Sequence, residues 1–309
     1  MIGVVFPGQG SQKPRMGEDL YRNDTFARQV FDQIEQATNV NVALLCFESD
    51  ESVLKQTQNA QLALYACGLA AYYALREAIP GLEVKGIAGH SVGEYTALAA
   101  AGMITVAEGA TLVKRRSELM AGAGKDRPGT MAAVIGLDAE ELQHAVNLAG
   151  GGVCVIANDN CPGQLVISGE IDAVQAASVK CGELGAKRVI PLQVSGAFHS
   201  PLMDAASEEL GKAIDRVHFS EGGVPVYSNV TAEIGKDWPP LLKEQLKSRV
   251  RWCETVEHMK RDGITTYVEC GSGEVLTGLL RRIDKDAKGL VVVDSATLAE
   301  TFTALGGAA

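Results

Sequence analysis

The chain has 309 residues, of which 46% are hydrophobic and 21% charged, and this composition is typical of a soluble globular protein with a large core. Its formal net charge of -10 at pH 7 argues against nucleic acid as a partner. The sequence has no apolar run of about 18 residues and no basic start followed by an apolar block, so we expect neither a membrane span nor a secretory signal.

The first third of the chain alternates apolar strands with helices. Ile2–Phe6 predicts a buried strand, and Pro7–Gln12 then forms a loop of the kind that places ligands at the end of a sheet. The loop lacks the GK[ST] of a phosphate-binding loop. Helical spacing of apolar residues predicts a helix over 18–37 and another over about 61–79, which Pro80–Gly81 ends.

The segment GHSVGEY, residues 89–95, has the pattern of a nucleophile elbow. An apolar strand over 84–88 precedes it, and an alanine-rich helix over 96–101 follows. A sharp turn between glycines exposes Ser91, and the free N–H groups at the start of the helix would stabilise an oxyanion there. A glycine-rich turn that matches GxSxG by chance is the alternative, because the chain has 34 glycines.

The next helix is predicted to start at the capping box Thr105–Glu108 and to end near Gly122. Arg116 lies three or four residues from each member of its apolar stripe: Leu112, Val113, Leu119 and Met120. A guanidinium on the buried side of a helix needs a partner. That partner is either a structural salt bridge or the carboxylate of a substrate.

After Gly122 the pattern changes to that of a small separate unit. Strands are predicted over 130–137, 153–157, 164–168 and 187–194, with helices over 139–148 and 172–184. This βαββαβ order is ferredoxin-like. We therefore predict a small ferredoxin-like domain at 125–193, inserted into a large α/β domain made of 1–124 and 194–309.

The remaining elements return to the large, hydrolase-like domain, whose sheet is predicted to be mainly parallel. Ser200 is a good N-cap and Pro201 a good first residue for a helix that runs to about Val217. His199 thus lies just before a helix N-terminus, which would keep it a neutral base. Further strands are predicted over 224–227, 265–269 and 290–293.

The other histidines and the cysteines have simpler interpretations. His90 is expected to pack against or orient the elbow, and three histidines fall on polar helix faces: His144, His218 and His258. Seven scattered cysteines without a CxxC pair predict free thiols in a reducing cytoplasm and provide no zinc site. We expect no metal and no cofactor.

The residues alone therefore indicate a serine nucleophile, a histidine base and an inward arginine that binds an anion. A triad would need a carboxylate between Ser91 and His199 in the chain. Asp159 and Asp172 lie in that interval, but both belong to the predicted inserted domain. A Ser–His dyad is therefore favoured over a triad.

Five blocks of the sequence together resemble malonyl-CoA:acyl-carrier-protein transacylases, and the likeness extends over essentially the whole chain. They are FPGQGSQ (6–12), GHSVGEY (89–95), Arg116, GAFH (196–199) and ECGSGEVLTGL (269–279). The order and spacing of these motifs are far more specific than GxSxG alone.

The resemblance implies a ping-pong transfer of a malonyl group. Ser91 would attack the thioester of malonyl-CoA with His199 as general base, and the phosphopantetheine thiol of an acyl carrier protein would then take the malonyl group. The backbone N–H groups of Gln9 and Val92 would form the oxyanion hole. Arg116 would bind the malonyl carboxylate.

Other substrate-binding assignments also come from the resemblance. The backbone carbonyl of Gln245 would orient the histidine, and Asn160 would line the cleft. His90 is also assigned to the substrate-binding residues. Phe198 matches the malonyl-selective form of its motif, because a bulky ring leaves little room for an α-methyl group. Rejection of one methyl group is worth about 1–3 kcal/mol, so we expect preference rather than exclusion. Val92 departs from the family, where leucine is common.

Fatty-acid synthesis is the predicted pathway, with three alternatives. The chain could load carrier proteins of a polyketide synthase, hydrolyse acyl thioesters with the same dyad, or only dock a carrier protein. Carrier proteins are acidic, so the exposed pairs Lys187–Arg188 and Arg281–Arg282 are candidates for docking. Exposed basic pairs are more commonly only solubilising. We expect a monomer.

Overall fold

A computed structural model describes residues 1–306, and its main feature is a five-stranded sheet in the order β7-β2-β1-β8-β9. All four neighbouring pairs are parallel, as predicted. The strands are β1 (Ile2–Phe6), β2 (Val84–Gly89), β7 (Val226–Tyr227), β8 (Thr266–Cys270) and β9 (Lys288–Val292). Because all strands run the same way, the loops after β1, β2 and β7 meet at one edge of the sheet.

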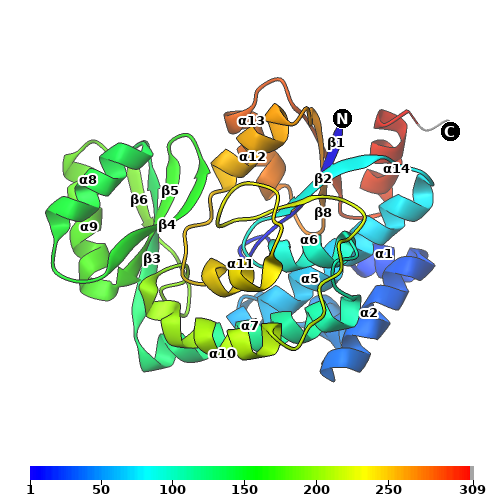
Figure 1. Cartoon of the computed structure of the whole chain (residues 1–309), viewed down its shortest axis with the longest axis horizontal. Helices are drawn as coiled ribbons and strands as arrows, with labels where there is room; N and C mark the ends of the chain where they lie inside the picture. Colours follow the sequence, from blue (N-terminus) through cyan, green and yellow to red (C-terminus); the bar gives the residue numbers. More distant parts are fainter. Residues whose placement is uncertain (307–309) are drawn as a thin grey trace.

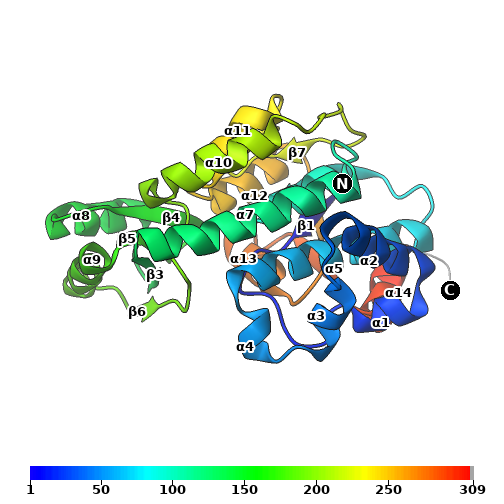
Figure 2. The same ribbon diagram turned by 90° about the horizontal axis from the view of Figure 1, so that it is seen from below.

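Helices cover both faces of this sheet (Figures 1 and 2). They are α1 (Glu18–Asn23), α2 (Thr25–Thr38), α3 (Val42–Glu48), α4 (Glu51–Leu54), α5 (Thr57–Ala78), α6 (Gly93–Ala100), α7 (Val106–Asp126), α10 (Asp204–Ile214), α11 (Trp238–Gln245), α12 (Trp252–Arg261), α13 (Val275–Ile283) and α14 (Ser295–Ala304). Helix α5 is buried on nearly every face, because it packs against α2, α6 and α7 as well as β8. This explains why its sequence is apolar all round.

A second sheet of four antiparallel strands lies to one side, drawn in green in Figure 1. Its elements are β3 (Gly129–Ile135), α8 (Ala139–Ala149), β4 (Cys154–Cys161), β5 (Gln164–Glu170), α9 (Ile171–Glu183) and β6 (Arg188–Pro191). This chain order and the strand order β4-β5-β3-β6 confirm the ferredoxin-like arrangement. The limits 125–193 of a separate domain stay a prediction, and residues 307–309 of the predicted large domain lie outside the described range.

The chain between α11 and α12, which belongs to the large part of the molecule, pairs with β4 of the small sheet. Val250 donates its amide to the carbonyl of Ala157 on β4 at 2.8 Å and accepts from the amide of Asp159 at 2.9 Å. Arg249 forms an ion pair with the side chain of Asp159. This connection fixes one wall of the space between the sheets.

Two predicted helices are interrupted in the structure. The helix predicted over 18–37 divides at Asp24, because the side chain of Asp24 caps the amide of Ala27 at 2.7 Å and starts α2 anew. Phe26, one of the apolar residues of that predicted helix, is 42% exposed. The helix predicted after Ser200 begins as a short 3₁₀ turn, η1 (Pro201–Met203), and α10 then ends at Ile214.

Residues 1–306 contain no helix that is both long and apolar enough to cross a bilayer. In the same residues, no group of three or more His, Cys, Asp or Glu side chains could hold a metal ion. All seven cysteines are free, and six of them are buried.

Candidate active site

Ser91 occupies the turn between β2 and α6 with a φ of 53°, a left-handed conformation that is strained for a residue with a side chain. Only glycine fits at the two flanking positions, because a Cβ atom there would clash with neighbouring backbone. A Cβ on Gly89 would lie 1.9 Å from the carbonyl of Gly93, and a Cβ on Gly93 would lie 2.3 Å from the carbonyl oxygen of Phe6. The glycines therefore permit the bend that exposes the serine hydroxyl.

His199 lies next to this hydroxyl, with Nε2 2.8 Å from Ser91 Oγ. Its Nδ1 lies 3.0 Å from the backbone carbonyl oxygen of Gln245. Because a carbonyl can only accept, Nδ1 carries the proton and Nε2 accepts from the serine. Burial, followed by the nearby charge of Arg116, lowers the pKa of His199 to about 3. The imidazole is therefore a neutral base, and a carbonyl rather than a carboxylate orients it.

Arg116 reaches the same hydroxyl from α7, whose predicted capping box at Thr105 is present. Its side chain is fully buried. The guanidinium donates to Ser91 Oγ at 3.1 Å, to Gln245 Oε1 at 3.1 Å and to Gln61 Oε1 at 2.5 Å. All of these acceptors are neutral, so the structural salt bridge considered from the sequence is not what holds Arg116 in the described chain. A buried cation with neutral partners is suited to bind an anion.

The loops after β1 and β2, which carry Gln9 and Val92, pack together beside the serine. The amide of His90 donates to the carbonyl of Phe6 at 2.9 Å, and a Cβ on Gly8 would lie 2.7 Å from the carbonyl oxygen of His90, so these loops are closely packed. Within the described residues, neither the amide of Gln9 nor that of Val92 donates a hydrogen bond to another protein group. Both N–H groups are thus available to an oxyanion.

A cleft of about 240 Å³ opens in front of Ser91, between the elbow and the small sheet. Its polar lining includes His90 and Asn160, whose Nε2 and Oδ1 lie 2.9 Å apart. Burial lowers the pKa of His90. The apolar lining consists of Met120, Met131, Ala133, Val166, Leu192, Val194 and Phe198. The structure thus places every sequence-predicted site residue in or beside this cleft.

Three buried polar residues of the site were missed in the sequence. Gln61 binds Arg116, Glu94 binds the side chain of Gln245, and Asn229 binds the backbone amide of Ser91. Gln61 and Glu94 could have been noticed as polar residues within otherwise apolar helical segments. Asn229 has no comparable local signal, because it follows a strand of only two residues.

Comparisons with known proteins place this geometry in context. Residues 4–300 match the acyl transferase domain family. The chain is 40% identical over 302 residues to the malonyl CoA-acyl carrier protein transacylase of Bacillus subtilis (strain 168), covering 96% of this chain and 95% of that protein. It is 42% identical over 287 residues to the protein of the same name from Synechocystis sp., covering 91% and 93% of the two chains.

Solved structures are similar over the same extent. The acyl-carrier-protein-S-malonyltransferase of Bartonella henselae has a TM-score of 0.93 and 40% identity, with 99% of each chain covered. A malonyl-transacylase in complex with its type II PKS acyl-carrier protein has a TM-score of 0.94 and 36% identity, with 98% of this chain and 99% of that chain covered.

Proposed function

The chain belongs to the malonyl-CoA–acyl carrier protein transacylases of the acyl transferase family, and on this premise we propose that Ser91, His199 and Arg116 perform its malonyl transfer. One observation supports the assignment above the others. The hydroxyl of Ser91 contacts both His199 Nε2, at 2.8 Å, and Arg116 Nη2, at 3.1 Å. A base and an anion-binding group therefore meet at one nucleophile.

The first half-reaction forms an ester on the enzyme. Ser91 Oγ attacks the thioester carbonyl of malonyl-CoA and gives its proton to His199 Nε2. The N–H groups of Gln9 and Val92 stabilise the oxyanion of the tetrahedral intermediate. The C–S bond then breaks, and the coenzyme A sulfur leaves with the proton that His199 returns.

Arg116 selects a substrate that ends in a carboxylate. Its hydrogen bond to Ser91 Oγ gives way when the hydroxyl becomes an ester, and the freed Nη2–H donates to the malonyl carboxylate instead. Phe198 lines the cleft and its ring leaves little room for an α-methyl group, while His90 and Asn160 contribute polar atoms to the same lining.

The second half-reaction repeats the chemistry with a carrier thiol. The phosphopantetheine thiol attacks the malonyl ester, His199 removes the thiol proton, and Ser91 recovers that proton as the new thioester forms. The acceptor is the carrier protein of fatty-acid synthesis, and a polyketide carrier is the alternative. Both carry the same thiol, so their protein surfaces decide between them.

One residue of each basic pair suggested by the sequence, Arg282 and Lys187, lies near a turn at the edge of the cleft, whereas Arg281 lines a separate groove beside β9 and α14. Arg282 donates to the carbonyl of Pro162 and to Gln164 Oε1, and Gln164 lines the cleft. The adjacent Gly136 packs against Lys187. We assign docking of the acidic carrier to Lys187 and Arg282, because opposite charges guide association at the cleft mouth.

An acyl-thioester hydrolase would use the same serine and histidine with water as acceptor. A hydrolase of neutral esters has no use for Arg116, which is buried at the nucleophile without a carboxylate partner. The buried cation therefore favours transfer of an acyl group that carries its own negative charge.

A transfer assay tests this function. Malonyl-, methylmalonyl- and acetyl-CoA are offered with phosphopantetheinylated carriers of both pathways, and radiolabelled malonyl ester is trapped on the wild type and on Ser91→Ala. We expect label on the wild type only, transfer to a carrier, and preference for malonyl. Rapid release of free malonate without transfer to any carrier would overturn the proposal.

A further inference from the structure

Glu94 is a buried carboxylate one helical turn beyond the nucleophile, and the steps above give it no role. It lies in the first turn of α6 and has no exposed surface. A carboxylate in such a place is costly unless hydrogen bonds satisfy both oxygens. Each oxygen has one short donor: the backbone amide of Asn229 at 2.6 Å on Oε1, and Gln245 Nε2 at 2.6 Å on Oε2.

The first donor, Asn229, holds the backbone of the elbow. Its Oδ1 accepts from the amide of Ser91 at 2.7 Å, and its Nδ2 donates to the carbonyl of Gly89 at 2.7 Å. These two bonds span the point where the chain adopts the strained φ of 53° at Ser91. Strained backbone persists only where neighbouring groups hold it, and Asn229 is such a group.

The second donor, Gln245, connects the three groups of the proposed mechanism. Its Nε2 also donates to the backbone carbonyl of Ser91 at 2.9 Å, its Oε1 accepts from Arg116, and its own carbonyl accepts from His199 Nδ1. An amide has a donating end and an accepting end. An ionised carboxylate only accepts, so Glu94 forces the amide to turn its oxygen toward Arg116.

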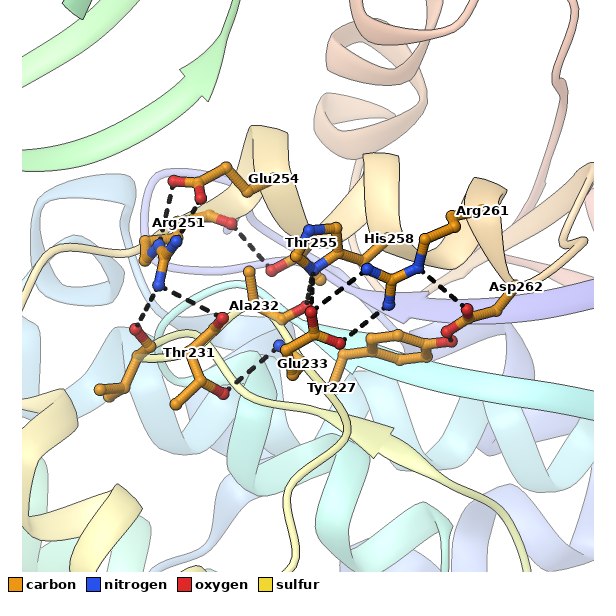
Figure 3. Close-up of polar contacts among 11 residues, drawn as sticks. Tyr227, Thr231, Ala232, Glu233, Arg251, Glu254, Thr255, His258, Arg261 and Asp262 are labelled. Atoms are coloured by element: carbon orange, nitrogen blue, oxygen red, sulfur yellow. Dashed lines mark hydrogen bonds and ion pairs between the residues drawn. The ribbon is translucent and has the colours of Figure 1, made fainter.

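The loop that carries Asn229 is anchored on its outer side by α12 and the residue before it (Figure 3). Arg251 donates to the carbonyls of Val230 and Thr231, and His258 Nδ1 donates to the carbonyl of Ala232 at 2.9 Å. Arg261 pairs with Glu233 at 2.9 Å. Because the outer side is fixed to α12, the hydrogen bond from the backbone amide of Asn229 to Glu94 holds the loop from its inner side, while the Asn229 side chain binds the elbow.

We propose that Glu94 is a positioning residue for the transfer reaction. Its ionised carboxylate fixes Asn229 and the Gln245 amide, and through them it holds Ser91 and Arg116 in one geometry. It also places a negative charge one amide away from the buried cation of Arg116, which otherwise has only neutral partners. This inference rests on the proposed malonyl transfer.

The decisive variant is Glu94→Gln, which keeps the shape and the acceptor for Asn229 but presents an NH₂ group to the NH₂ group of Gln245. If the Gln245 amide rotates in response, its NH₂ faces Arg116 and its oxygen faces the Ser91 carbonyl, and both contacts are repulsive. These repulsive contacts would displace Arg116 and Ser91, and misplacement of reacting groups by about 1 Å lowers rates by about a hundredfold. We expect such a fall in kcat/KM for malonyl, and a lower ratio of malonyl to acetyl transfer.

Glu269→Gln is the matched control. Glu269 is also fully buried and accepts hydrogen bonds from the amides of Leu276 and Thr277, but it contacts no residue of the site in the part of the chain that is described. We expect this variant to have a lower melting temperature with wild-type kcat and wild-type selectivity. Equal losses of activity and selectivity in both variants would show that Glu94 acts only through folding, and would overturn the inference.

Two further outcomes are decisive. Folded Glu94→Gln with wild-type kcat and selectivity contradicts the inference, whereas a wild type that transfers no malonyl group contradicts the proposed function instead. If Glu94→Gln does not fold, Asn229→Asp takes its place, because it keeps the acceptor for Ser91 but puts an oxygen against the carbonyl of Gly89. Wild-type kcat in folded Asn229→Asp would equally overturn the proposal.

Discussion

The backbone carbonyl oxygen of Gln245 lies 3.0 Å from Nδ1 of His199, so the chain itself orients the base. The side chain of the same glutamine points elsewhere and accepts from Arg116 at 3.1 Å. Gln245 therefore has two separable roles, one independent of its side chain and one dependent on it.

Gln245→Ala separates these roles. The carbonyl remains, so we expect acetyl transfer to persist, while Arg116 loses one partner and malonyl transfer falls by about tenfold, in line with the worth of one hydrogen bond to a charged group. Steady-state rates with both substrates measure this. Equal losses for acetyl and malonyl would mean that the side chain acts mainly through the backbone carbonyl of Ser91, which transfer of either acyl group requires.

The fall of kcat/KM at low pH should follow protonation of Glu94. His199 has a pKa lowered to about 3, so it stays neutral above pH 5. Burial raises the pKa of Glu94 to about 7, although its hydrogen bonds and the charge of Arg116 on α7 oppose the shift. Its other ionisable neighbour, Tyr95, has a raised pKa and stays neutral.

Protonated Glu94 donates where it should accept, so kcat/KM should rise as pH increases through about 7 and then level off. The measurement is kcat/KM for malonyl-CoA in the wild type and in Glu94→Gln between about pH 5 and pH 9, a range that spans the titration of the Glu94 carboxyl. The variant should lack the fall at low pH. A fall of the same position and depth in both enzymes would exclude Glu94 as its source.

Arg116→Ala should reverse the preference for a charged acyl group. We expect malonyl transfer to fall by about a hundredfold or more, because a charge-assisted pair is lost, while acetyl transfer is retained or increased. Arg116→Lys keeps the charge but lacks the planar fork, so its malonyl rate should lie between those of Arg116→Ala and the wild type. A parallel loss for acetyl would indicate that Arg116 acts on Ser91 rather than on the substrate.

Phe198→Ala tests the size limit of the acyl pocket. The ring is 4% exposed and lines the cleft, so its removal makes room for an α-methyl group. We expect the ratio of methylmalonyl to malonyl transfer to rise by about tenfold. The melting temperature is measured alongside, because loss of a buried ring destabilises the fold. An unchanged ratio would place the methyl-excluding wall elsewhere.

Much of the fold could be predicted from the sequence because its signals are local. The capping box at Thr105 and the βαββαβ order each depend on residues close together in the chain. The break at Asp24 was missed because one side-chain hydrogen bond outweighs the periodicity.

The buried residues that hold the nucleophile and the arginine in place could not be predicted from local sequence patterns. The contact between Asn229 and Ser91 joins residues 138 apart, and that between Gln245 and Glu94 joins residues 151 apart. No spacing rule connects such pairs. The candidate nucleophile and base were found because each lies in a distinctive motif, whereas the residues that hold them in place have no such motif of their own.

Charge reversal tests the proposed docking surface. Lys187→Glu combined with Arg282→Glu should raise KM for the carrier protein by about tenfold and reduce its sensitivity to salt, because attraction to an acidic partner is replaced by repulsion. Formation of the malonyl ester on Ser91 from malonyl-CoA should not change, since the carrier protein takes no part in this first half-reaction. The control is Arg28→Glu on α2, at the end of the molecule away from the small sheet (Figure 1). If the control raises KM for the carrier as much as the double variant does, net charge rather than this surface governs docking.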